Sequence, residues 1–102
     1  MKLKSRYVGE YGFKIRILTG IDLTLMDVFK LEVTKPALAG GVETITWTGA
    51  VIGVPTDGTF EATIPNVLDI AGTYTILAVV GKTAQSEIIG GPITLEVIAR
   101  PS

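Results

Sequence analysis

Alternating apolar and polar residues recur along the chain and predict β-strands. In one run, Phe13, Ile15 and Ile17 alternate with a glycine and two basic residues. Successive side chains of a strand point to opposite faces, so such a run buries one face and leaves the other in water. The same alternation returns in three further runs, 27–35, 59–64 and 92–99. Two runs are less polar on their second face, 42–48 and 73–81, and the second of these is typical of a central strand.

Glycine and proline separate these runs at intervals of about 8 to 12 residues, a spacing typical of a β-sandwich or barrel. Helix has little support, because β-branched residues dominate and no stripe with a 3.6-residue period extends over three turns. A single helical turn is expected at 66–70. We predict an all-β fold, an antiparallel sandwich of two sheets with about seven strands. The expected strands cover 3–8, 12–18, 27–35, 42–48, 59–64, 73–81 and 92–99.

The length and composition favour one folded domain covering residues 1–102. A chain of 102 residues buries roughly two-thirds of its unfolded surface, which suffices for one core. With 47% hydrophobic and 19% charged residues it does not have the composition of a disordered chain. The longest apolar stretch, 76–80, is far shorter than the roughly 20 residues of a membrane-spanning helix. The N-terminal residues also lack the apolar core of a secretory signal, so we expect a chain without a signal peptide and no contact with a membrane.

The net charge of −1 provides no general attraction for nucleic acid, and we predict no nucleic-acid partner. One basic cluster can form a patch for phosphates or an acidic partner if its two strands are neighbours. The favoured interpretation is the solvated face of two amphipathic strands, because no aromatic side chains are placed to stack on bases. The cluster consists of Lys2, Lys4, Arg6, Lys14 and Arg16.

The side chains that ordinary catalytic sites require are missing. The sequence holds no histidine and no cysteine, so it cannot form the usual nucleophile–base pairs, a disulfide or a cysteine-type zinc site. No phosphate-binding loop is present, and Asp57-Gly58 with Glu61 offers too few ligands for calcium. We therefore predict no catalytic residues, no cofactor and no metal site. A mechanism with paired carboxylates stays open in principle, although turn-bracing is the favoured role of the acids near strand ends, Asp22, Asp27, Asp57 and Asp69.

Trp47 is the single tryptophan, and two roles are open for it. It can fill the centre of the fold, where aromatic side chains bury a large area, or it can form a platform for a sugar. Sugar-binding surfaces present more than one exposed ring. The other aromatic residues mostly lie in phase with core positions, which favours the core for Trp47: Tyr7, Tyr11, Phe13, Phe29, Phe60 and Tyr74.

The segment 68–76, LDIAGTYTI, resembles the strand entry of immunoglobulin-like domains, in which an Asp, a small pair and a Tyr precede the strand. The resemblance implies that the predicted two-sheet sandwich is immunoglobulin-like, and that the Tyr74 hydroxyl binds upstream backbone and pins the corner between two strands. Ile76 stands where disulfide-bonded members have cysteine, so packing alone must hold this sandwich. The residues to which we assign structural roles are Trp47, Asp69, Gly72 and Tyr74.

From about Tyr7 to Ile98, the succession of motifs is similar to small immunoglobulin-like domains of tailed-phage structural proteins. These are the N-terminal domain of baseplate upper proteins and related stand-alone prophage proteins. The resemblance rests on the order of the segments 12–17, 21–24, 29–36, 55–60 and 68–74. It implies a non-enzymatic structural component of a tail, baseplate or other virion part, made in the bacterial cytoplasm. It transfers no binding residues, because the matching positions are turn and core residues.

Three functions follow as expectations. The leading one is assembly into a phage or prophage particle, through contacts with other phage structural proteins or through self-association. The free strand edges of a sandwich can pair with a partner, and the outward-facing residues suit a surface that a partner covers: Leu77, Val79 and Ile98. The second is a carbohydrate-binding or adhesive module, which requires exposed rings around a shallow groove, with Trp47 and Tyr11 as the discriminating residues. The third is an enzyme that uses two carboxylates, which requires a cleft with paired acids.

Overall fold

The computed structural model describes residues 2–37, 39–65, 68–83 and 87–99, and it is all-β, which confirms the predicted class. The described residues contain no α-helix, and none of them forms a helix with the length and hydrophobicity of a membrane span. A 3₁₀ helix, η1, covers Pro55–Asp57. The strands are β1 (Arg6–Tyr7), β2 (Lys14–Leu18), β3 (Val28–Pro36), β4 (Val42–Val51), β5 (Thr59–Thr63), β6 (Gly72–Gly81) and β7 (Glu87–Ile98).

The prediction of a helical turn at 66–70 falls partly outside the described residues, at 66–67. Residues 68–70 are not helical, so the prediction is wrong for them. The short helix lies instead at Pro55–Asp57, where the sequence indicated a turn. Proline is favourable in the first turn of a helix, because its missing N–H has no partner there.

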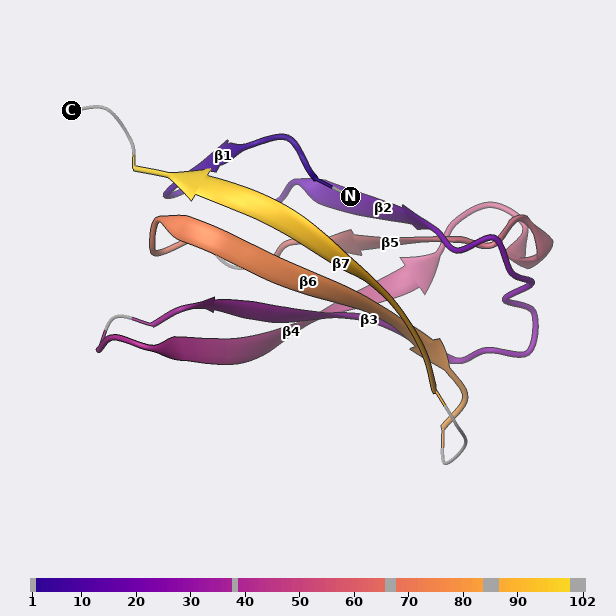
Figure 1. Ribbon diagram of the computed structural model, residues 1–102. Helices are drawn as coiled ribbons and strands as arrows, with labels where there is room; N and C mark the ends of the chain where they lie inside the picture. Colours follow the sequence, from indigo (N-terminus) through magenta and orange to yellow (C-terminus); the bar gives the residue numbers. More distant parts are fainter. Residues whose placement is uncertain (1, 38, 66–67, 84–86, 100–102) are drawn as a thin grey trace.

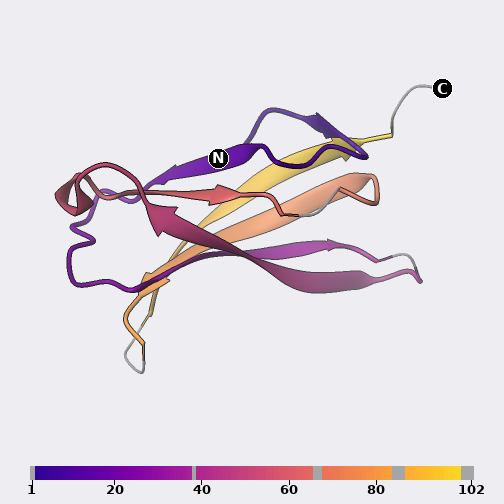
Figure 2. The same ribbon diagram turned by 180° about the vertical axis from the view of Figure 1, so that it is seen from behind.

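The strands form one mixed sheet in the order β1-β7-β6-β3-β4-β5-β2, which curls into a half-barrel (Figure 1). Seen from behind, β4 passes from the neighbourhood of β3 toward β5 (Figure 2). It pairs with β3 over Val42–Thr48 and with β5 over Gly49–Val51. Every pairing is antiparallel except that of β1 with β7. The strands are therefore joined by β4 into one continuous sheet, and the two-sheet immunoglobulin-like sandwich stays a prediction.

Gly49 shows why β4 can change partners at this point. A Cβ atom at Gly49 would lie 2.9 Å from the Phe60 ring and 3.0 Å from the Glu61 carbonyl oxygen. Only glycine allows the backbone of β4 to approach β5 this closely, and such glycines often mark a sharp bend in a sheet.

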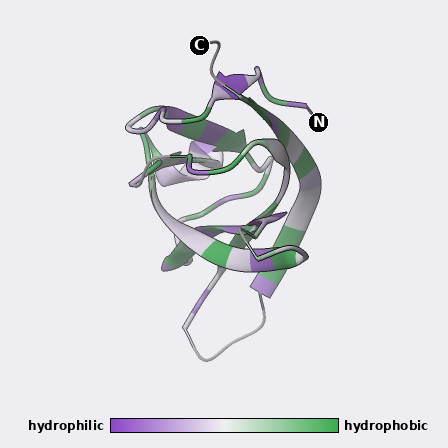
Figure 3. Ribbon diagram, turned by 90° about the vertical axis from the view of Figure 1, so that its left-hand side faces the viewer, coloured by the Kyte–Doolittle hydropathy of each residue, from purple (hydrophilic) through white to green (hydrophobic). Residues whose placement is uncertain are grey.

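Viewed end-on, the sheet curls around a common interior (Figure 3). The apolar side chains of the strands fill this interior. The alternation of β2 appears as buried Ile15 and Ile17 between exposed neighbours. Trp47 and Tyr74 are also buried, at 3% and 1% exposure. The other core residues are Leu23, Leu31, Val33, Phe60, Ala62, Ile64, Leu68, Ile76, Ala78, Val80, Ile93, Leu95 and Val97.

Three predicted strand boundaries differ from the structure by three or more residues, because pairing partners decide them. β4 continues to Val51 instead of ending at 48, since its last three residues pair with β5. β7 begins at Glu87, although Gly90, Gly91 and Pro92 indicated a turn. The segment pairs with the end of β6, and an irregularity in register between the pairs Ile76–Ile93 and Ala78–Gly90 accommodates one extra residue in β7. β1 is shorter than the predicted strand 3–8. Lys2 makes only an isolated bridge to Thr94, and continuous pairing with β7 covers Arg6–Tyr7.

Candidate interaction surface

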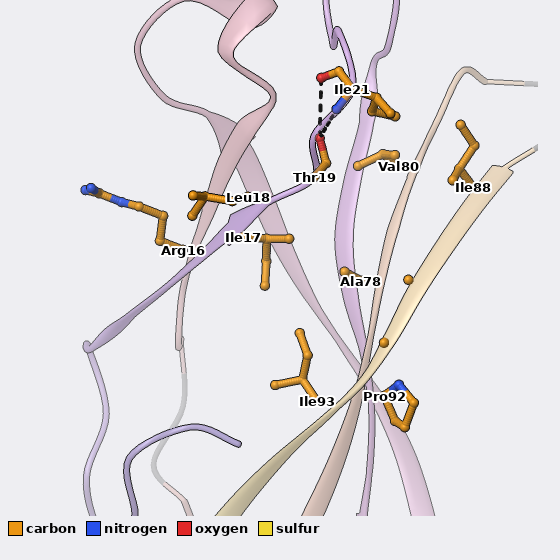
Figure 4. Close-up of a pocket in the computed structure, with 12 residues that line it drawn as sticks. Arg16, Ile17, Leu18, Thr19, Ile21, Ala78, Val80, Ile88, Pro92 and Ile93 are labelled. Carbon is orange, nitrogen blue, oxygen red and sulfur yellow. Dashed lines mark hydrogen bonds between the residues drawn. The ribbon is translucent and has the colours of Figure 1, made fainter. Parts of the chain in front are cut away.

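An apolar groove of about 540 Å³ lies between the end of β2 and the first half of β7 (Figure 4). In the close-up, Ile17 and Ile93 point toward each other across it, and Ala78 and Val80 line its floor from β6. Arg16 is the one charged residue among the residues that line it. The full lining is Arg16, Ile17, Leu18, Thr19, Ile21, Ala78, Val80, Ile88, Gly90, Gly91, Pro92 and Ile93.

The groove exists because the inner face of β7 is not covered along its first half. Ile88 pairs with Val80, and Gly90 pairs with Ala78. Directly paired residues share a face of the sheet, so Ile88 and Gly90 lie on the same face as two core residues. Ile88 is nevertheless 50% exposed, and a Cβ atom at Gly90 would meet no atom within 4 Å. The face of β7 that belongs to the core from Ile93 onward is therefore open to solvent in the first half of the strand.

The N-terminal segment covers the second half of β7. Leu3 donates a backbone hydrogen bond to the Thr94 carbonyl (2.8 Å), and Val8 donates one to Ile98 (3.0 Å). Leu3 packs against the core on this side. The segment thus closes the half-barrel along residues 94–98 and leaves the stretch beside Glu87–Gly91 open.

One rim of the groove is held by a compact turn. The Thr19 hydroxyl donates a 2.7 Å hydrogen bond to the Gly58 carbonyl, and its oxygen accepts a bond from the Ile21 backbone amide at 3.2 Å. Gly58 has a φ of +74°, and a Cβ there would lie 2.4 Å from the Ile21 carbonyl oxygen. Glycine is therefore required for both the backbone conformation and the close approach, and the rim is a defined structure.

Beside the groove, the outer edges of β2 and of Glu87–Gly91 have no partner strand among the described residues. β2 pairs with β5 on one side, and no described strand pairs with its other side. β7 pairs with β6, and the β1 pairing covers only Val97 and Ile98. Backbone N–H and C=O groups on such edges can pair with an added strand.

The predicted basic cluster does not form one patch by strand pairing, because β1 pairs with β7 whereas β2 pairs with β5. Arg6 instead forms an ion pair with Glu10 (3.4 Å) and stacks over the Phe13 ring at 4.1 Å. Lys14 and Arg16 both contact Glu61, at 3.7 and 3.3 Å. Two cations thus share one carboxylate on the outer face of β2.

The four structural residues lie away from the groove. The Tyr74 hydroxyl donates a 2.9 Å hydrogen bond to the Ile70 carbonyl, which is upstream backbone as the sequence resemblance implies. Gly72 adopts a φ of +141°, and a Cβ there would lie 2.7 Å from the ring of Pro36. Trp47 lies in the core, and Asp69 is half-exposed beside β3. None of these four residues lines the groove, and their structural roles stay a prediction.

Asp69 has a partner that the sequence did not reveal. Lys35 is the one buried charged residue in the described part of the chain, at 6% exposure, and its Nζ lies 2.5 Å from Asp69 Oδ1 and 3.0 Å from Glu43 Oε1. Burial alone would lower the pKa of Lys35, but hydrogen bonds to the two carboxylates outweigh burial and raise it. The Lys35 bond lowers the pKa of Asp69, while burial raises the pKa of Tyr74. The alternation places Lys35 in phase with Leu31 and Val33 on the inner face, which was the available signal.

The four aspartates considered for a two-acid mechanism lie in separate turns or pairs, and the two carboxylates that do converge, Glu43 and Asp69, both bind Lys35. Asp22 accepts hydrogen bonds from the Thr24 amide and hydroxyl, which lower its pKa. Asp27 accepts hydrogen bonds from Thr83. Asp57 lies in η1, and Asp69 pairs with Lys35. In the described part of the chain, no three acidic side chains gather as metal ligands would.

Two aromatic residues differ from the prediction that they occupy core positions. Tyr7 is 45% and Tyr11 is 67% exposed, because β1 is short and Tyr11 follows in the loop to β2. Of the three residues expected to face outward, Ile98 is exposed and Leu77 is partly exposed, whereas Val79 is fully buried.

No protein-family model matches the sequence, and the search of curated proteins gives no match.

Proposed function

We propose that the chain is a non-enzymatic structural component of a phage or prophage particle, in a tail, baseplate or other virion part, and that it acts through protein–protein contacts. The observation that carries this proposal is the open inner face at Ile88 and Gly90. Apolar surface of this kind favours burial against another protein. The motif succession supplies the virion context, and it implies a protein made in the bacterial cytoplasm that later joins the particle.

We also propose that the half-barrel is an immunoglobulin-like sandwich whose layers are joined by β4. The Tyr74–Ile70 hydrogen bond supports this assignment, since it matches the tyrosine corner of such domains. The order β7-β6-β3 in one layer, with β2 and β5 paired in the other, also agrees with it.

Trp47 and the carboxylates support an assembly role over the two other functions. Trp47 is buried and therefore offers no face to a sugar. The described aspartates each take part in a separate turn or ion pair, as structural residues do. A binding or adhesive module keeps one observation in its favour, the exposed rings of Tyr7 and Tyr11.

The experiment is mass spectrometry of particles purified from a bacterium that encodes the chain, after induction and density-gradient separation. We expect the chain in intact particles at a fixed ratio to known structural proteins. If it is absent from intact particles and stays in the cell lysate, the proposal is wrong.

A glycan-array experiment tests the alternative with the purified protein and a Tyr7→Ala, Tyr11→Ala double variant. Saturable sugar binding that the double variant loses would favour the adhesive function. Absence of binding by both proteins agrees with the structural role.

A further inference from the structure

We infer that the groove between β2 and β7 receives an extended strand from a different protein chain, which pairs with both free edges and completes the half-barrel. This rests on the proposed function in one respect, namely that the partner is another structural protein. The strand would continue the line of the N-terminal segment, which already lies parallel to β7 at Lys2 and at Arg6–Tyr7.

The direction of the strands is suitable for such an addition. β1 runs parallel to β7, and successive antiparallel pairings from β7 to β2 make β2 run opposite to β7. A strand that continues the line of β1 is therefore antiparallel to β2, the more stable arrangement for a strand pair. Addition of a strand to exposed edges is a common mode of peptide recognition, in which backbone bonds provide affinity and pockets select side chains.

The groove selects a strand with alternating side chains. Its inner side is lined by Ile17, Ala78 and Val80, and the empty space at Gly90 accepts an apolar side chain. A compact apolar ligand would also fill the space, but it would leave the edges of β2 and β7 unpaired. The two facing edges therefore favour a peptide strand over a small molecule.

The charges indicate that the partner strand is acidic on its outward side and that it is not β2 of a second copy. Lys14 and Arg16 share Glu61, and both cationic side chains are 62% exposed. The groove lining contains no acidic residue. A second copy offering its own β2 would bring the same surplus of positive charge, and like charges on neighbouring strands repel. A strand with a carboxylate beside Arg16 would instead be attracted.

In the experiment that tests this inference, the added strand is an N-terminal extension of the same chain. Six residues are added before Met1, with valine at positions in phase with Leu3 and alternating threonine and glutamate between them. Leu3 packs against the core whereas Lys2 and Lys4 are exposed, so this phase directs the valines inward. A matched control has the same six residues shifted by one position, which directs the valines outward.

Thermal unfolding and amide hydrogen exchange are then compared with the original protein. We expect the in-phase extension to raise Tm by about 5 °C or more. We also expect it to slow exchange of outward-pointing amides in Lys14–Leu18 by roughly tenfold or more. The shifted extension should produce neither effect. Equal behaviour of the two extensions would overturn the inference. A higher Tm without slower exchange in β2 would also overturn it, because the added strand would then not pair with β2.

Two variants add specificity to the test. Gly90→Leu should fold, because Gly90 has free space and no left-handed backbone, and it should abolish the effect of the in-phase extension by filling its site. Arg16→Gln should reduce the Tm gain of the glutamate-containing extension and make it less dependent on salt. An in-phase effect unchanged in Gly90→Leu would place the added strand elsewhere and refute the inference.

These measurements need no particle or natural partner. Failure of the in-phase extension, with the chain still present in purified virions, would refute the groove assignment and leave the proposed function intact. Success of the extension, with the chain absent from virions, would refute the virion role and leave the strand-accepting groove.

Discussion

Replacement of Tyr74 by phenylalanine isolates the hydrogen bond that joins the β6 strand to its preceding loop. Tyr74→Phe keeps the buried ring, which is 1% exposed, and removes only the hydroxyl that donates to Ile70. A typical protein hydrogen bond contributes about 0.5–1.5 kcal/mol, and a buried acceptor left without a donor costs about 1–3 kcal/mol. Ile70 is only partly buried, so water can reach part of this region. We therefore expect a loss of about 1–1.5 kcal/mol in the free energy of unfolding.

Urea denaturation followed by tryptophan fluorescence measures this loss, since Trp47 is the one tryptophan and is buried. The m-value should stay constant while the midpoint falls. In thermal unfolding, each kcal/mol corresponds to a decrease of about 4–8 °C in a domain of this size. Tyr7→Phe is the matched control, because Tyr7 is half-exposed and should change stability little. The reasoning is refuted if Tyr74→Phe is no more destabilising than Tyr7→Phe.

Three further predictions concern the core, the groove rim and the buried lysine. Trp47→Ala should lower the free energy of unfolding by about 3–5 kcal/mol in calorimetry, and a loss below about 1 kcal/mol would contradict its place in the core. Gly58→Ala should destabilise by at least about 1 kcal/mol more than Gly20→Ala in urea, because both glycines have a φ of +74° but only Gly58 also faces a close backbone oxygen. The pKa of Asp69 is lowered in the fold, so the Lys35–Asp69 pair contributes stability above the unfolded Asp pKa and loses it as pH falls through the folded value. The raised pKa of Lys35 gives the opposite limb, in which stability is lost as pH rises above its unfolded value through the folded value. Asp69 is half-exposed, so the pair should contribute less than about 1 kcal/mol to the stability that is lost in acid. Urea midpoints measured from pH 7 down to pH 2 should therefore fall less in Asp69→Asn than in the unaltered protein. Equal falls in the two proteins would show that the pair is not responsible.

The stability effects at Tyr74 and Lys35 arise at one end of the half-barrel, away from the groove. Variants there should change stability without changing strand acceptance. Variants at Arg16 and Gly90 should do the reverse, because these residues line the groove and neither lies in the buried core. This separation allows the fold and the proposed interaction to be tested independently.

Local sequence determined the all-β class and most of the strands. The alternation of Ile15 and Ile17 with basic residues, and of Phe60 and Ala62 with polar ones, is a property of neighbouring residues, and it survives in the burial of β2 and β5. The Tyr74 motif also acts locally, since its hydroxyl reaches only four residues back along the chain. These features could be predicted because they depend only on residues that are close together in the sequence, within one strand or one turn.

Tertiary structure decided the features that depend on partners distant in the sequence. Gly90, Gly91 and Pro92 have turn-forming propensity, yet pairing with β6 holds this segment in a strand. Lys35 lies at an inward position, but its charge is tolerated only because Glu43 and Asp69 are brought to it by the β3–β4 pairing and the loop before β6. The groove likewise exists only because the curl of the sheet brings β2 near β7 while the N-terminal segment covers half of β7. Alternation specifies which face of a strand is apolar, whereas only the assembled fold determines whether that face is covered.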